Sequence, residues 1–113
     1  MTIQYKNQGI DLNSTGTLSI LTCPTDATIL IKQIQINNGS GSGVNLNVQV
    51  TDTSASSTFR IFNEAVTGAA SKDIINYTLV LEAGDILKMT AGTADEIQGI
   101  VSYALLDRSQ QNG

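Results

Sequence analysis

The sequence predicts an all-β domain, an antiparallel β-sandwich of the jelly-roll kind with seven to eight strands and little or no helix. Several segments alternate apolar and polar residues with a period of two, and turn signals separate them every eight to twelve residues. No long segment carries a helical apolar stripe with caps, and the best helical candidate, residues 64–72, is short and contains Gly68. A chain of 113 residues is long enough for one core and too short for two ordinary domains.

The first predicted strands lie in the N-terminal half of the chain. Residues 17–23 form a strand that ends at Pro24, whose fixed φ and missing N–H belong at a strand end. Residues 28–38 carry alternating isoleucines whose parity changes midway, as it does at a β-bulge. Residues 44–51 alternate most regularly. Because the glycine- and serine-rich residues 38–43 form an expected loop between these two strands, we expect the strands to pair as a hairpin.

The C-terminal half contains the remaining predicted strands. Residues 58–66 hold several large apolar side chains and form one strand. Residues 77–81 and 86–90 alternate on either side of a Glu-Ala-Gly-Asp turn signal at 82–85, so we expect a second hairpin there. Residues 97–106 place apolar side chains on both faces, which predicts a central strand that is covered on both sides.

The two ends of the chain differ from its middle. We expect a polar N-terminal arm over residues 1–16, one sandwich domain over 17–107 and a polar tail over 108–113. Tyr5 lies in the arm, where it suits an anchor on a neighbouring subunit or a fold-back onto its own domain. The other aromatic rings lie within apolar segments and are expected in the core: Phe59, Phe62, Tyr77 and Tyr103.

Charge argues against two classes of partner. The chain has six basic and ten acidic residues and no histidine, and its net charge of −4 opposes attraction to a phosphate backbone. No apolar run approaches the roughly 20 residues that cross a bilayer. We therefore expect neither nucleic acid nor a membrane as a partner.

The sequence contains few residues that are suited to catalysis or metal binding. The lone Cys23 has no histidine to activate it and is expected to be a small buried apolar residue. Asp95 and Glu96 are adjacent in a turn region, where they fit solvated loop charges. Asp26 and two later aspartates, Asp52 and Asp85, lack the spacing of a calcium loop and would have to meet through the tertiary fold. We expect no enzyme activity, no catalytic residues, no cofactor and no metal.

The order of several short motifs resembles that of small virion proteins of tailed bacteriophages. These motifs are Leu-Thr-Cys-Pro at 21–24, the isoleucine-rich strand at 27–38, the alternating strand at 44–48, Leu-Glu-Ala-Gly-Asp within 79–87, and Ile-Val-Ser-Tyr at 100–103. The resemblance implies a repeated virion component, either a capsid cement or decoration protein or an accessory of the neck and tail. Its implied partners are further copies of itself, as a trimer or a dimer, and the major capsid protein or other virion proteins.

Two other functions fit the predicted fold. A receptor- or glycan-binding module would use polar loop residues such as Asn38, Ser40 and Ser42. A trimeric signalling-ligand-like jelly roll has a similar "Leu-x-x-Gly-Asp" hairpin. The low aromatic content argues against both, since stacking on sugars or partners usually needs exposed rings. The sequence singles out no interface residues.

Overall fold

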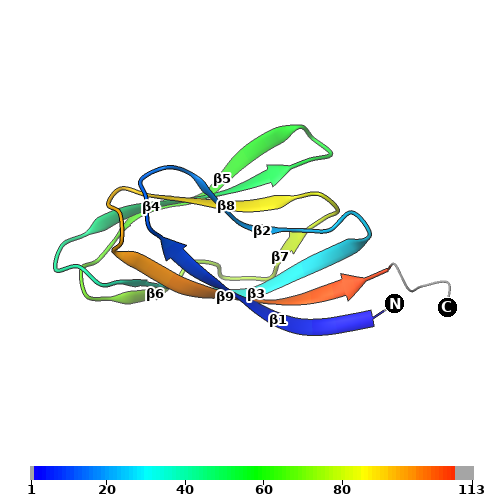
Figure 1. The fold of residues 1–113 in the computed structure, drawn as a ribbon, viewed down its shortest axis with the longest axis horizontal. Helices are drawn as coiled ribbons and strands as arrows, with labels where there is room; N and C mark the ends of the chain where they lie inside the picture. The colour runs from blue at the N-terminus through cyan, green and yellow to red at the C-terminus, as the bar shows by residue number, and fades with distance from the viewer. Residues whose placement is uncertain (1, 109–113) are drawn as a thin grey trace.

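The computed structural model describes residues 2–108, which form nine strands in two packed antiparallel sheets (Figure 1). No helix occurs among these residues, and hence none that could cross a membrane. The predicted all-β sandwich is confirmed. Sheet A has the order β1 (Thr2–Leu12), β9 (Ile97–Asp107), β3 (Ala27–Asn38) and β6 (Ser71–Asp73), and β7 (Leu79–Leu81) also pairs with β3. Sheet B has the order β2 (Leu18–Thr22), β8 (Ile86–Ala91), β4 (Val44–Asp52) and β5 (Ser57–Val66).

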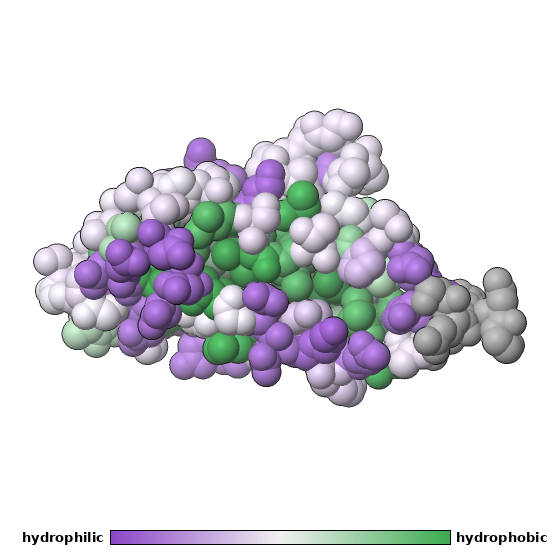
Figure 2. Space-filling model, viewed as in Figure 1, coloured by the Kyte–Doolittle hydropathy of each residue, from purple (hydrophilic) through white to green (hydrophobic). Residues whose placement is uncertain are grey.

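The core lies between the two sheets and is built by alternating side chains. Ile29 and Ile31 of β3 point inward, as do Ile34 and Ile36, and all four are at most 1% exposed. The β3–β9 register shifts between Ile31 and Gln33, which is the β-bulge that the change of parity predicts. In the view of Figure 2, hydrophobic residues gather along the middle of the molecule, with polar residues around them.

Strand β9 is central in sheet A, as predicted, because it pairs with β1 on one side and β3 on the other. Gly99 is required where β9 passes β3. A Cβ atom at this position would lie 2.1 Å from the carbonyl oxygen of Gln35, so any side chain would force the two strands apart.

Both predicted hairpins are wrong. β3 and β4 belong to different sheets, as do β7 and β8, so the loops that connect them cross from sheet A to sheet B. Asn38 directs the first crossing: it is fully buried, and its side-chain amide donates to the carbonyl oxygens of Ser42 and Val66 at 2.9 Å each. Gly84 permits the second crossing with a φ of 83°. Alternation identifies strands, but it does not say whether the next strand joins the same sheet.

The N-terminal segment is part of the sandwich. Residues 2–12, which we expected in a polar arm, form β1 and pair residue for residue with β9. Ile10 and Leu12 anchor the strand because both are buried in the core. Of the predicted tail at 108–113, only Arg108 lies within the described residues, and its backbone N–H donates to the carbonyl oxygen of Asp26 at 2.9 Å.

The aromatic residues divide between core and surface. Tyr103 is buried as predicted, and Phe62 is half-buried against the core. Phe59 and Tyr77 are 52% and 87% exposed, so their predicted burial is wrong. Phe59 is exposed because β5 is the edge of sheet B and the end of the β4–β5 hairpin stands away from the other sheet (Figure 1). Tyr77 lies in the connection between the short strands β6 and β7.

Candidate docking surface

The outer face of sheet A carries an apolar stripe that crosses four strands. Tyr5 of β1 is the cross-strand partner of Ala104 on β9, Ala104 pairs with Leu30 on β3, and Leu30 pairs with Val80 on β7. Directly paired residues point to the same face of an antiparallel sheet. In β3, β7 and β9 the residues on either side of Leu30, Val80 and Ala104 pack into the core, so these three residues face outward, and Tyr5 shares their face through its pairing with Ala104. We call Tyr5, Leu30, Val80 and Ala104 the apolar stripe.

The two ends of the apolar stripe are exposed, whereas Leu30 is half-buried and Ala104 is buried between them, and a second row extends the stripe. Tyr5 is 84% exposed and Val80 is 50% exposed. Beside them Ile3, which is 56% exposed, pairs with Leu106. Together these residues expose on the order of 400 Å² of apolar surface, the size of the largest apolar patch on a typical monomer, and such patches are often functional. This face is therefore suited to docking against another protein surface.

The sequence contained a signal for the stripe that we missed. Three segments carry three apolar residues in a row, at 29–31, 79–81 and 104–106. In a strand, such a run places apolar side chains on both faces. We predicted a two-sided pattern only for residues 97–106. Which of the runs are neighbours depends on the sheet order, which the sequence does not reveal.

The other half of the outer face is polar and rich in amides. Gln33, Gln35 and Asn37 of β3 lie beside Ser102 and Gln98 of β9 in register. A shallow depression of about 250 Å³ opens here, lined by Gln35, Ile36, Asn37, Gly99 and Ile100.

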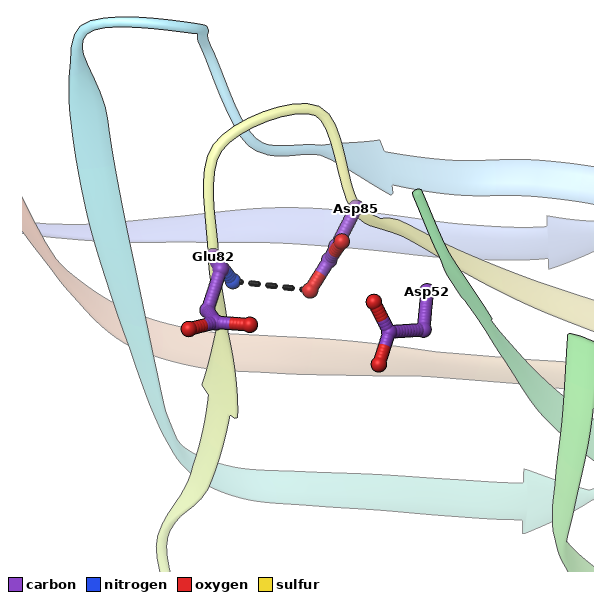
Figure 3. Close-up of side chains that lie close together, drawn as sticks. All are labelled: Asp52, Glu82 and Asp85. Atoms are coloured by element: carbon purple, nitrogen blue, oxygen red, sulfur yellow. Dashed lines mark hydrogen bonds between the residues drawn. The ribbon is translucent and has the colours of Figure 1, made fainter. Parts of the chain in front are cut away.

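Three carboxylates come together at the end of the sandwich where the β7–β8 turn meets the β4–β5 loop. The side chains of Asp52, Glu82 and Asp85 point toward one another, and their oxygens lie within 4.8 Å (Figure 3). Two of the aspartates considered for calcium, Asp52 and Asp85, thus meet in the tertiary fold. Asp26 is not in this cluster, and Glu82 was not expected in it.

Two of these carboxylates accept hydrogen bonds from the loops around them. Asp85 is 4% exposed, and its two oxygens accept from the backbone N–H groups of Thr53 at 3.0 Å and Glu82 at 2.9 Å. Asp52 accepts from the Ser54 hydroxyl at 2.7 Å and from the Ala55 N–H, and these bonds hold the pKa of Asp52 below its ordinary value. Both aspartates therefore organise the loops that surround them.

The other candidate residues have local roles. Cys23 is 1% exposed, as predicted; its thiol donates to the carbonyl oxygen of Ala27, and burial raises its pKa. A thiol of this kind is not an activated nucleophile. Asn38 is buried and its side chain is bonded within the loop, so it does not offer the polar contact that a glycan-binding loop would need. Asp95 is exposed and Glu96 is half-buried.

Comparison with models of known protein families gives no match, and comparison with curated protein sequences gives none either. Solved structures of similar fold do exist, all at low sequence identity. One is the capsid of the Helicobacter pylori bacteriophage KHP30, with a TM-score of 0.58 and 8% identity over 96% of this chain and 90% of that one. Another is the Drosophila NLP-core, described for pentamer formation and histone binding, with a TM-score of 0.59 and 10% identity over 92% and 99%.

A third similar structure is the particle of the virus IBDV. Its TM-score is 0.55, with 10% identity over 94% of this chain. This chain spans about a third of the length of that protein, at 31%. At such identities the three likenesses show a shared fold.

Proposed function

We propose that this chain is a structural component of a bacteriophage virion, a capsid cement or decoration protein that binds the particle as a repeated oligomer. The observation that carries the proposal is the apolar stripe on the outer face of sheet A. The motif order that resembles small tailed-phage virion proteins supports it. So does the fold shared with structures of a phage capsid and a virus particle.

The size of the stripe suits a protein that acts in many copies. About 400 Å² of buried apolar surface provides a gross stabilisation on the order of 10 kcal/mol. The loss of translational and rotational freedom on binding costs about 4–15 kcal/mol, so one copy would bind weakly. Linking copies raises the effective concentration of each further contact, and the assembly then binds strongly without any single strong site.

Capsids that lack this chain provide the test. The purified chain should co-sediment with them to a fixed stoichiometry and raise the temperature at which they release their genome. Val80→Lys should weaken this binding by at least about tenfold, because it places a charge in the stripe. Ile61→Lys is the matched control, since Ile61 is 40% exposed on β5 of the other sheet. A folded wild-type chain that does not bind these capsids would contradict the proposal.

A second function is favoured by the amide-rich half of the same face. Its glutamine and asparagine side chains around a shallow depression suit the hydroxyl groups of a glycan. A glycan array with the wild-type chain and with Gln35→Ala would reveal this activity. Binding of a glycan that Gln35→Ala abolishes, together with no binding to capsids, would favour a receptor-binding module over a decoration protein.

A further inference from the structure

The edges of the two sheets are not equally protected against pairing with another chain. An edge strand presents unpaired N–H and C=O groups, and proteins shield it by keeping it short or bulged. At one edge of sheet A, β6 and β7 have three residues each. In sheet B, β2 has five residues and a register shift between Ser19 and Leu21, and the β4–β5 pairing shifts between Val48 and Gln49.

Strand β1, at the other edge of sheet A, lacks these protections. It has 11 residues, contains no proline and pairs with β9 without any register shift from Thr2 to Leu12. Its charged residues are Lys6 and Asp11. By length and regularity, β1 is therefore the edge best suited to accept another strand.

The hydrogen bonds at its C-terminal end show which backbone groups point outward. The Leu12 carbonyl accepts from the N–H of Asp95, which lies just before β9, at 2.9 Å. Because these groups alternate along an antiparallel strand, those of the odd-numbered residues point away from β9. Two of the outward carbonyls already have partners: Asp11 accepts from Asn13, and Gly9 accepts from the side chain of Gln8.

Within the described part of β1, the residues that keep both an outward N–H and an outward carbonyl oxygen for pairing are Ile3, Tyr5 and Asn7. No partner strand occupies this side of β1 among the described residues. These three positions are symmetric about Tyr5, which is the residue with the largest exposed ring on this edge.

We propose that β1 pairs antiparallel with β1 of a second copy, around a two-fold axis that passes through sheet A at Tyr5. Tyr5 then faces Tyr5 of the second copy, and Ile3 faces Asn7. A register centred one residue further along would place Lys6 against Lys6, and like charges directly opposite destabilise a pair. The contact is isologous and closes at two subunits.

This register also aligns the two apolar stripes. Because Tyr5 starts the stripe in each copy, the two stripes run on across the dimer as one continuous band on one face. The inference deepens the proposed function, on which it rests for its biological role, by naming the contact between copies. The pairing itself is tested in solution, where capsids play no part.

Light scattering on the purified chain tests the pairing directly. The wild type should have twice the mass of one chain. Tyr5→Lys should weaken the dimer by roughly 30-fold or more, because it removes a central aromatic contact and opposes two charges. Tyr77→Lys is the matched control: Tyr77 is 87% exposed, against 84% for Tyr5, but lies between β6 and β7, so this variant should remain dimeric.

A proline variant separates strand pairing from simple face-to-face packing. Asn7→Pro removes an outward N–H at an edge position, where proline is tolerated, so the fold should persist while the dimer dissociates. Far-ultraviolet circular dichroism and a thermal melt of each variant verify folding. A monomeric wild type, a trimer or pentamer, or a folded Asn7→Pro variant that stays dimeric would overturn the pairing. Failure to bind capsids by a dimeric wild type would instead contradict only the proposed function.

Discussion

Asp85 joins three loops at one end of the sandwich. Its carboxylate accepts from Thr53 and Glu82, its carbonyl oxygen accepts from the N–H of Cys23 at 2.9 Å, and the neighbouring Gly84 N–H donates to the Cys23 carbonyl oxygen at 2.9 Å. The Ala-Gly-Asp turn was recognisable from sequence. The burial of its aspartate was not, because the loop that donates the Thr53 N–H lies about 30 residues away in the sequence.

Replacing this carboxylate should destabilise the fold. Asp85→Ala leaves two partly buried N–H groups without this acceptor, and we expect the free energy of unfolding to fall by about 1–3 kcal/mol. Asp85→Asn keeps one acceptor oxygen and should cost less. Guanidinium denaturation measures both, and Asp26→Asn, at an exposed position, serves as the control. A loss under about 0.5 kcal/mol in Asp85→Ala would contradict this role.

Cys23 should make stability depend on pH in the alkaline range. Burial raises the pKa of its thiol above the ordinary value of 9.0, so the folded state holds the proton more tightly than the unfolded state. This contribution is fully present below pH 9.0 and is lost as the pH rises through the folded-state pKa. The unfolding free energy should therefore fall more steeply above pH 9.0 in the wild type than in Cys23→Ala. If the unfolding free energies of the wild type and of Cys23→Ala changed in parallel with pH, this role of Cys23 would be contradicted.

At the scale of elements, glycine positions differ in how closely the backbone of a neighbouring strand approaches them. Gly99→Ala would place a Cβ atom 2.1 Å from the Gln35 carbonyl oxygen, whereas Gly9→Ala on β1 meets nothing within 4 Å. We expect Gly99→Ala to cost about 3 kcal/mol or more, and Gly9→Ala to be neutral or stabilising by up to about 1 kcal/mol. Guanidinium midpoints of the two variants compare them directly. Equal midpoints would contradict the close approach of β9 and β3.

The strands themselves were largely predictable, and the sheets were not. Seven of the nine strands lie where alternation placed them, and even the bulge in β3 was visible as a change of parity. Alternation is a local signal, whereas sheet membership is set by contacts far apart in sequence. The loop after β3 contains glycine and serine as a hairpin loop does, but the buried side chain of Asn38 turns the chain into the other sheet.

Strand β1 was missed because its pattern is inconspicuous. Of its 11 residues, only Ile10 and Leu12 are buried, and polar side chains occupy most of the rest. Backbone hydrogen bonds to β9 hold the strand in place. Such bonds do not depend on the side chains, so the sequence pattern does not reveal them. The apolar runs that contribute to the docking surface were visible in the sequence, but their arrangement was not, since its four residues come from four strands whose order the sequence does not reveal.

At the scale of the whole molecule, the chain should fold only when its last strand is present. β9 lies between β1 and β3, which do not pair with each other. Without β9, β1 would therefore have no partner strand in sheet A. A chain truncated after Glu96 should lack cooperative unfolding, as measured by calorimetry. Truncation after Arg108 removes only the residues that follow the described strands, and the resulting chain should unfold like the full chain. A cooperative transition in the chain truncated after Glu96 would contradict this.

The central place of β9 also orders events during synthesis. While the ribosome is still making residues 97–107, β1 and β3 lack the strand that lies between them in sheet A, and β1 has no other partner strand there. The edge of β1 is then not yet held in the conformation that accepts a second copy. Self-association is thereby delayed until β9 has been made, and chains that lack β9 are kept out of any assembly that the mature protein forms.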